Sequence, residues 1–125
     1  EYAEKVTADN TGIVLNLAIN YGGQAEILHA VQNIVSDVQG GLLRVEDIDS
    51  QKFEYYLYTR GLPAPDLLIR PRGDLRISNF MLWQIAYAEI WTTEVYWPAF
   101  TPEMFLEAVK AYGGRERRYG GLITK

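Results

Sequence analysis

From residue 65 the sequence reads Pro65-Asp66-Leu67-Leu68-Ile69-Arg70-Pro71-Arg72-Gly73-Asp74-Leu75-Arg76-Ile77-Ser78-Asn79-Phe80, and the segment continues through Trp83 and Glu89. Residues 66–69 form an apolar run between two prolines, which suits a strand buried on both faces of a parallel sheet. The residues after it predict a loop that carries several arginines. Ser78 and Asn79 then predict the start of a mostly apolar helix that ends at about Trp91.

Three arginines, Arg70, Arg72 and Arg76, make this segment a candidate phosphate or diphosphate site. Arg70 stands at the carboxyl end of the expected strand, where open α/β sheets bind their ligands. Ser78 would cap the expected helix, whose first N–H groups and positive dipole end also favour negative charge. Each charge-assisted hydrogen bond contributes roughly 1.5–3 kcal/mol, enough for two arginines and a serine to hold a diphosphate at about micromolar strength. The alternative is that the arginines are solvated surface side chains, and the residues alone leave it open.

Composition and charge limit the classes of protein to consider. A chain of 125 residues is enough for one domain with a modest core, and we expect residues 1–125 to lie in a single domain. The net charge of −4 argues against a nucleic-acid binder, which needs a basic face. The chain has no cysteine, no apolar run of the ~18 residues that span a membrane, and no signal-peptide pattern at Glu1. We therefore expect a soluble, cytoplasmic protein that contacts a membrane at most peripherally.

The remaining hydrophobic pattern predicts an α/β fold. Residues 13–19 have the pattern of a buried strand, and residues 94–97 alternate as a last short strand. Residues 1–11 finish a helix, and further helices are predicted over residues 25–38, over residues 45–59 and from Thr101 to Tyr112. Strands alternating with helices in this way predict a parallel sheet flanked by helices.

Two further features have both a structural and a functional interpretation. Gly22 and Gly23 allow positive φ or a close backbone approach, which a ligand loop and an ordinary strand-to-helix turn both need. His29 is the only histidine, and we interpret it as a solvated side chain rather than a catalyst. The acidic residues between positions 46 and 54 are interpreted as a solvated helix face.

Three segments together resemble the cis-prenyltransferase family, specifically the undecaprenyl diphosphate synthases. The first combines Leu67-Leu68-Ile69-Arg70, Gly73-Asp74 and Arg76-Ile77-Ser78-Asn79-Phe80-Met81-Leu82-Trp83-Gln84-Ile85-Ala86-Tyr87-Ala88-Glu89. The second reads Leu15-Asn16-Leu17-Ala18-Ile19-Asn20-Tyr21-Gly22-Gly23, and the third reads Arg115-Glu116-Arg117-Arg118-Tyr119-Gly120-Gly121. The motifs are long, follow the family's order and cover nearly the whole chain.

The resemblance implies an enzyme that transfers isopentenyl units to an allylic prenyl diphosphate and forms cis double bonds, as in synthesis of the undecaprenyl lipid carrier of the cell wall. It implies Mg²⁺ as cofactor, isopentenyl diphosphate and an allylic prenyl diphosphate as substrates, and a homodimer. Arg70, Arg76 and Ser78 would be the catalytic residues and would bind the isopentenyl diphosphate. The family's fold is a larger parallel sheet flanked by helices.

Other positions receive roles through the resemblance alone. Asn20 and Asn79 would contribute to the substrate site. Arg118 and Gly120 match an Arg-x-Gly element that would reach across the dimer and complete the diphosphate site of the other subunit.

Glu89 matches a family glutamate linked to magnesium, which makes it a candidate metal ligand. In a helix over residues 79–91, Glu89 would lie on nearly the same stripe as Ser78 but ~16 Å further along the axis. The two side chains would therefore not serve one phosphate. The family also uses a loop histidine here, and this chain has Leu75 at that position.

The chain departs from the family pattern at four more positions. Asp74 replaces a glutamate, which keeps the charge but shortens its reach, and Gln24 replaces an arginine after the glycine turn. Pro71 and Arg72 replace small residues, so the loop gains a cation and loses a backbone donor.

One motif of the family has no counterpart here. The family's amino-terminal part carries an Asp-Gly-Asn-x-Arg motif that holds magnesium and the allylic diphosphate, and this sequence contains no Asp-Gly pair. We therefore expect the chain to be the carboxyl-terminal half of such an enzyme, inactive alone. The alternatives are a non-catalytic partner subunit and a truncated diphosphate-binding fragment.

Overall fold

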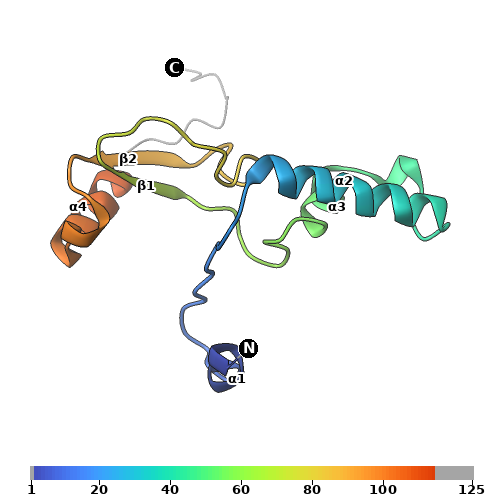
Figure 1. Cartoon of the computed structure of the whole chain (residues 1–125), viewed down its shortest axis with the longest axis horizontal. Helices are drawn as coiled ribbons and strands as arrows, with labels where there is room; N and C mark the ends of the chain where they lie inside the picture. The colour runs from blue at the N-terminus through green and yellow to red at the C-terminus, as the bar shows by residue number, and fades with distance from the viewer. Residues whose placement is uncertain (1, 115–125) are drawn as a thin grey trace, which may run out of the picture.

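The computed structural model describes residues 2–114 of the chain (Figure 1). The elements are α1 (Tyr2–Thr7), α2 (Gly23–Gln39), the 3-10 helix η1 (Val45–Asp47), α3 (Ser50–Tyr55), β1 (Leu67–Pro71), β2 (Glu89–Thr93), the 3-10 helix η2 (Trp97–Ala99) and α4 (Pro102–Gly113). The strands and α4 lie at one end of an elongated molecule, α2 and α3 lie at the other end, and α1 is set apart (Figure 1). Within residues 2–114, no helix is both long enough and apolar enough to cross a membrane.

β1 and β2 pair in parallel and form the sheet of the described chain. Leu67 lies opposite Glu89, and Arg70 lies opposite Thr92. The strand predicted at residues 66–69 is confirmed, and it extends through Pro71. Because parallel strands need a connection that returns along the sheet, residues 72–88 form a crossover from the carboxyl end of β1 to the amino end of β2. The arginine loop is the first part of this crossover.

Gly73 makes the turn that leaves β1. Its backbone φ is +66°, a left-handed conformation that side chains other than glycine rarely adopt. Its N–H donates to the Thr93 carbonyl oxygen at 2.8 Å, which holds the turn against β2. A Cβ added to Gly73 would lie 2.7 Å from Glu94 Oε1. The backbone conformation therefore favours glycine here, whereas the Glu94 carboxylate is the end of a flexible side chain that could move aside.

α4 packs on the sheet through its apolar face. Thr101 caps the helix, because its Oγ1 accepts a hydrogen bond from the Met104 N–H at 3.4 Å, and Pro102 occupies the first helical position. Ala108 is fully buried, and α4 contacts both strands. The helix predicted from Thr101 to Tyr112 is confirmed.

α2 carries much of the buried apolar surface at the other end of the molecule. Ala30 and Ile34 lie on its buried face, and Leu57, which follows α3, is also buried. The helix predicted over residues 25–38 is confirmed. This core is small, so each buried side chain contributes a large share of it.

The helix predicted over residues 45–59 is wrong in its extent, because two short helices replace it. α3 begins after Asp49, whose side chain accepts the Lys52 N–H at 2.7 Å, and it ends at Tyr55. Beyond it, the Tyr58 N–H donates to Glu26 Oε1 at 2.7 Å instead of to a carbonyl one turn earlier. A tertiary hydrogen bond therefore takes the backbone donor that a longer helix would use.

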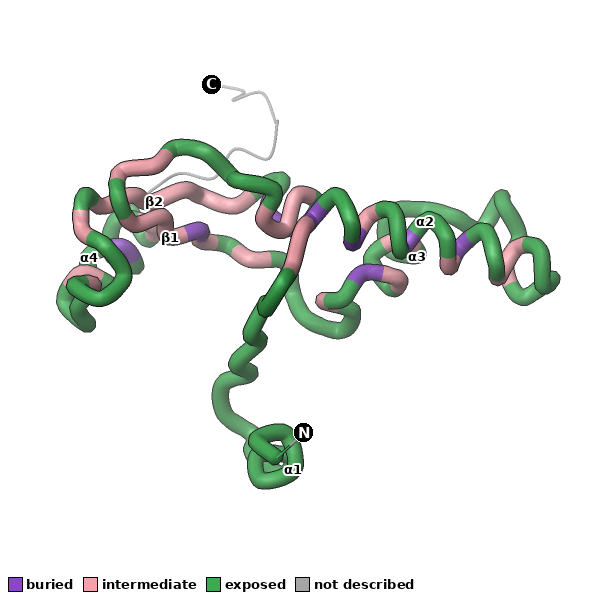
Figure 2. Tube along the Cα trace, viewed as in Figure 1, coloured by how far each residue is buried: buried purple, intermediate pink, exposed green. Residues whose placement is uncertain are grey.

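The strand predicted at residues 13–19 is absent from the structure. These residues lie in the exposed segment between α1 and α2 (Figure 2), and Ile13 is 98% exposed. A strand needs a neighbour for its backbone N–H and C=O groups, and β1 and β2 pair only with each other. The segment keeps the composition of a buried strand without the partner that would make it one.

The helix predicted over residues 79–91 and the strand predicted at residues 94–97 are also wrong. A series of turns occupies residues 78–87, and the strand that follows is β2, at Glu89–Thr93. Ser78, Asn79 and Met81 have φ values of 54°, 60° and 48°, which no right-handed helix accommodates. Ser78 is therefore not a helix cap.

We predict that Leu57→Ala lowers the free energy of unfolding by about 2–5 kcal/mol, because Leu57 is 2% exposed and its truncation leaves a cavity in the core. Leu42→Ala is the matched control, because Leu42 is 81% exposed, and we expect a change within about 0.5 kcal/mol. Urea denaturation followed by circular dichroism measures both values. Equal losses in the two variants would contradict the position of the core.

We also predict opposite effects for two glycine-to-alanine changes. Gly73→Ala should destabilise the protein by about 1–2 kcal/mol, because alanine is strained at its positive φ. Gly113→Ala lies in α4 with nothing within 4 Å of the new methyl group, and helix propensity should leave stability unchanged or raise it by up to about 1 kcal/mol. Thermal unfolding of both variants decides the sign. A Gly73→Ala protein as stable as wild type would rule out the turn described here.

Candidate anion site

Arg70 and Ser78 come together at the carboxyl end of β1. Arg70 Nη2 donates to Ser78 Oγ at 3.3 Å, across the first part of the crossover. The Nε atom of Arg70 is buried and has no hydrogen-bond partner among the described residues. A buried charged donor without a partner costs free energy, so this guanidinium is suited to an anion that supplies the missing acceptor.

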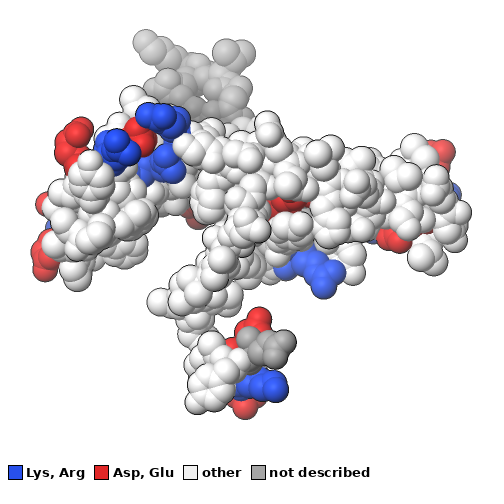
Figure 3. Space-filling model, viewed as in Figure 1, with Lys and Arg blue, Asp and Glu red and all other residues white. Residues whose placement is uncertain are grey.

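Arg76 has a different partner. Its Nη2 forms an ion pair with Asp74 Oδ1 at 2.9 Å, and the Arg76 side chain is 75% exposed. The sequence suggested that Arg70, Arg76 and Ser78 share one anion, whereas the structure joins only Arg70 to Ser78 directly. A bound diphosphate would have to compete with the Asp74 carboxylate for Arg76. Basic side chains with an acidic side chain among them gather over the sheet end of the molecule (Figure 3).

Arg72 adds a third cation to the same loop, next to an aromatic ring. Its guanidinium carbon lies 5.8 Å from the centre of the Tyr96 ring, within the range of a cation–π interaction. The backbone N–H of Arg72 donates to the Val95 carbonyl oxygen at 2.9 Å. These contacts fix the start of the loop to the segment after β2.

Asn79 binds the backbone of the glycine turn that precedes α2. Its side-chain Oδ1 accepts the Gln24 N–H at 2.9 Å, and its backbone oxygen accepts the Gly23 N–H at 2.7 Å. A Cβ on Gly23 would lie 2.9 Å from Leu82 Cγ, so only glycine allows this approach. The Asn79 side chain therefore acts here as a structural clamp. Asn20, the other predicted asparagine, lies at the start of the same turn with a φ of 52°.

The segment with Ser78 is held in an unfavourable backbone conformation. Three of its residues, Ser78, Asn79 and Met81, adopt left-handed φ values. Such conformations cost roughly 1–2 kcal/mol per residue and persist only where surrounding contacts determine them. The contacts of Asn79 with the glycine turn are part of that support. Strain of this kind is common where a loop is shaped to present a functional side chain.

Glu26, which no sequence motif singled out, is a carboxylate at the centre of a buried hydrogen-bond network. Glu26 is 1% exposed and accepts hydrogen bonds from the Tyr21 hydroxyl, the Tyr58 N–H and the Gln84 side-chain amide. Burial, and then the hydrogen bond to Glu26, raises the pKa of the Tyr21 hydroxyl, which keeps it protonated as a donor. A signal was present in the sequence, because Glu26 lies four residues before the buried Ala30 on the same helix stripe.

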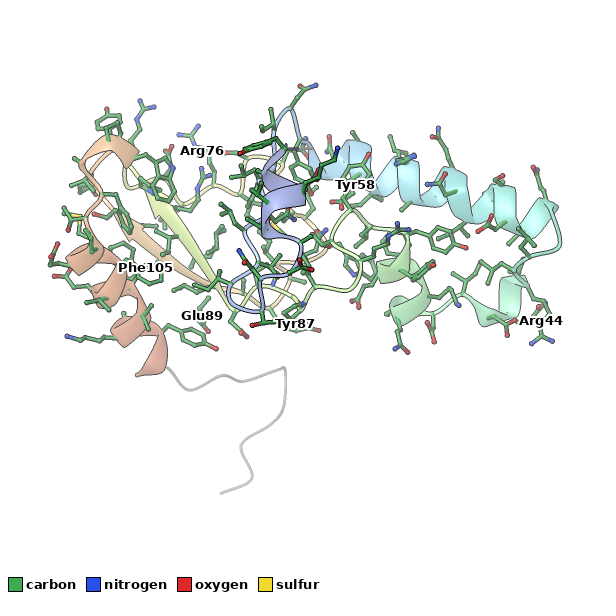
Figure 4. The ribbon with its side chains drawn as sticks, turned by 90° about the horizontal axis from the view of Figure 1, so that it is seen from below. Arg44, Tyr58, Arg76, Tyr87, Glu89 and Phe105 are labelled. Atoms are coloured by element: carbon green, nitrogen blue, oxygen red, sulfur yellow. The ribbon has the colours of Figure 1, made fainter. Side chains whose placement is uncertain are left out.

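Glu89 lies at the other end of the sheet from Arg70. It is the first residue of β2, at the level of Leu67, whereas Arg70 is at the level of Thr92. Leu67 and Arg70 are three residues apart along the strand, so Glu89 and Arg70 are separated by about 10 Å in the strand direction. Figure 4 shows Arg76 and Glu89 well apart, on either side of the strands. The helix stripe that the sequence predicted for Ser78 and Glu89 does not exist.

The described residues do not fit a magnesium site on their own. Residues 2–114 contain no group of three or more histidine, cysteine, aspartate or glutamate side chains placed to hold a metal ion. Asp74, the acid within the arginine loop, is paired with Arg76. Arg118 and Gly120, which the resemblance assigned to a dimer-spanning element, lie outside the described residues.

A cavity of about 810 Å³ lies beside the crossover and separate from the arginine loop. Its lining comes from residues 50–66 and 82–87 and includes Trp83 and Tyr87. Trp83 Nε1 donates to Glu54 Oε1 at 3.2 Å, and its ring lies 4.5 Å from that of Phe53. None of the three loop arginines lines this cavity. The candidate anion site at the carboxyl end of β1 is therefore a different place from the cavity.

Three comparisons with known proteins agree. The family model described as "Putative undecaprenyl diphosphate synthase" matches residues 1–120. The isoprenyl transferase of Geobacillus kaustophilus is 56% identical over 125 residues, which cover 100% of this chain and 49% of the relative. The isoprenyl transferase of Clostridium perfringens is 47% identical over 121 residues, covering 97% and 48%.

A solved structure is similar as well. Lavandulyl diphosphate synthase from Lavandula x intermedia, in complex with dimethylallyl diphosphate, matches with a TM-score of 0.92 and 40% identity. The match covers 96% of this chain and 52% of that one, and the chain spans about half the length of the curated relatives it matches. The α/β fold with a parallel sheet and flanking helices, predicted from the sequence, is confirmed. The chain belongs to the prenyltransferase family of the undecaprenyl diphosphate synthases, the cis-prenyltransferases.

Proposed function

We propose that the protein containing this chain transfers isopentenyl units to an allylic prenyl diphosphate with cis double-bond formation, and that this chain supplies the isopentenyl diphosphate site. The observation that carries the proposal is the Arg70 guanidinium, whose Nη2 meets Ser78 Oγ at 3.3 Å and whose buried Nε has no partner among the described residues. In a member of this family, a diphosphate is the anion that best suits such a site.

The residues of this chain bind and orient the substrate in this proposal. Arg70 contributes two directed donors from a rigid strand end, and Ser78 adds a hydroxyl that donates to a phosphate oxygen. Arg76 leaves Asp74 for the diphosphate, because a diphosphate carries more charge than one carboxylate. Asn79 holds the adjoining glycine turn, which keeps the Ser78 segment in place, and Asn20 would contribute to the substrate site from the start of that turn.

The reaction itself needs alignment and charge stabilisation. The double bond of isopentenyl diphosphate forms a carbon–carbon bond to the allylic carbon, the allylic diphosphate leaves with the electron pair of the broken C–O bond, and a proton is lost to give the cis double bond. Bound Mg²⁺, which the family resemblance implies, would neutralise phosphate charge. Because residues 2–114 do not hold a magnesium site on their own, its ligands would have to include groups outside them.

The wider assembly is proposed from the family resemblance. A homodimer would bring Arg118 and Gly120 of one subunit to the diphosphate site of the other. The product would be a long polyprenyl diphosphate for a cell-wall lipid carrier, made in the cytoplasm with peripheral membrane contact. Size-exclusion chromatography with light scattering tests the dimer directly.

We predict that Arg70→Ala weakens isopentenyl diphosphate binding about 10- to 100-fold, because it removes charge-assisted hydrogen bonds worth roughly 1.5–3 kcal/mol. Isothermal titration of isopentenyl diphosphate into the full-length protein measures the change. Arg44→Ala is the control, because it removes the same charge from an exposed arginine paired with Asp47. Equal affinities in wild type, Arg70→Ala and Arg44→Ala, with the fold intact by circular dichroism, would refute the proposed site.

We also predict that the full-length protein elongates farnesyl diphosphate with isopentenyl diphosphate, and that Ser78→Ala lowers kcat/KM about 10-fold through one lost hydrogen bond. Radiolabelled isopentenyl diphosphate and thin-layer chromatography of the products give the rate. Binding of isopentenyl diphosphate without any elongation would instead favour a non-catalytic partner subunit or a diphosphate-binding fragment.

A further inference from the structure

The buried carboxylate of Glu26 is not used by the proposed site, yet it is connected to it. Of the described residues, only Glu26 and Gln84 are both polar and buried, with exposures of 1% and 8%. They contact each other across 58 positions of sequence, because Gln84 Nε2 lies 3.1 Å from both carboxylate oxygens of Glu26. A pair of this kind is costly to bury unless its hydrogen bonds are satisfied, so its position needs a physical reason.

Glu26 joins three separate parts of the chain. The Tyr21 hydroxyl donates to its Oε2 from the turn before α2, and the Tyr58 N–H donates to its Oε1 at 2.7 Å from the turn after α3. The Gln84 amide donates from the crossover and also lies 3.1 Å from Thr59 Oγ1. All of these groups point donors at Glu26, so an acceptor with two charged oxygens suits the position.

The Glu26 carboxylate determines which way the Gln84 side-chain amide is turned. Its Nε2 faces the acceptors, while its Oε1 is buried and has no hydrogen-bond partner among the described residues. Turning the amide over would give Oε1 the neighbours of Nε2, but it would also place an oxygen against the Glu26 carboxylate. The observed orientation leaves one acceptor unsatisfied and keeps the bond to Glu26.

Two links lead from Glu26 to the segment that carries Ser78. The first passes through Tyr21, whose ring meets Phe80 edge-on with the ring centres 5.7 Å apart. The second link is Gln84, three residues after Met81. Phe80 lies between Asn79 and Met81, both of which have left-handed backbone conformations.

We infer that Glu26 is a positioning residue: through Tyr21 and Gln84 it holds residues 78–84 in place, with their left-handed Ser78, Asn79 and Met81, so that Ser78 Oγ remains beside Arg70. Asn79 fixes the amino end of this segment on the glycine turn, and Glu26 fixes its carboxyl end. The inference rests on the proposed function in its last step, where the fixed Ser78 binds diphosphate. The first step, the fixed segment, does not depend on a ligand.

The test uses three variants in the full-length protein. Glu26→Gln places two amide NH₂ groups against each other and should release the segment. The double variant Glu26→Gln/Gln84→Glu reverses the pair, since a carboxylate at position 84 accepts from an amide at position 26, and it should restore it. Glu46→Gln is the control for the charge change, because Glu46 is exposed in η1.

Hydrogen exchange gives the ligand-independent readout. In Glu26→Gln, amides of residues 78–84 should exchange at least tenfold faster than in wild type, while those of α4 keep their wild-type rates. The double variant and Glu46→Gln should match wild type. Equal acceleration in α4 would mean that Glu26 serves only general stability, and unchanged exchange in residues 78–84 would mean that it holds nothing there. Either result overturns the inference.

Titration with isopentenyl diphosphate tests the last step. Glu26→Gln should weaken binding about three- to tenfold, and the double variant should recover it. Faster exchange in residues 78–84 with unchanged affinity for isopentenyl diphosphate would overturn the claim that the fixed segment supports ligand binding. Absence of binding by wild type would refute the proposed function, while the exchange data would still decide the positioning of the segment. If Glu26→Gln does not fold, Tyr21→Phe removes only the hydroxyl that donates to Glu26, and it should show the same local acceleration to a smaller degree.

Discussion

The parallel pairing of β1 with β2 is the constraint on which the site depends. Two parallel strands that follow each other in the chain need a connection that returns along the sheet, and residues 72–88 provide it. The connection begins at the end of the sheet where Arg70 lies and ends at the level of Glu89. The candidate anion-binding residues are therefore gathered at its start, and the candidate metal ligand lies at its finish. One topological requirement separates the two.

The crossover is held from outside, because its own backbone has few regular hydrogen bonds. Asn79 connects it to the turn before α2, and Gln84 connects it to Glu26. These contacts compensate for three left-handed residues and keep Ser78 at Arg70. The local positive charge of the arginine loop exists in a chain whose net charge is −4, which is consistent with a single anion site rather than a basic surface.

Local sequence patterns predicted the elements whose contacts are local. The strand at residues 66–69, α2 and α4 were predicted because their apolar periodicity and caps are encoded within each segment. The supposed helix over residues 79–91 failed because an apolar run does not distinguish a helix from turns packed against a distant glycine turn. Residues 13–19 have strand composition, but a strand exists only with a neighbour. Glu26 was missed because its partners lie up to 58 positions away.

The distance in sequence between the groups that hold the crossover also sets an order of events in folding. Asn79 meets Gln24 across 55 positions and Gln84 meets Glu26 across 58, so each contact must close a long loop of the chain. Contacts between remote positions form slowly, because the chain must first close long loops. The Ser78 segment is therefore expected to be assembled last, after the helices and the strand pair. A newly made chain would then acquire its secondary structure before it acquires its capacity to bind a diphosphate.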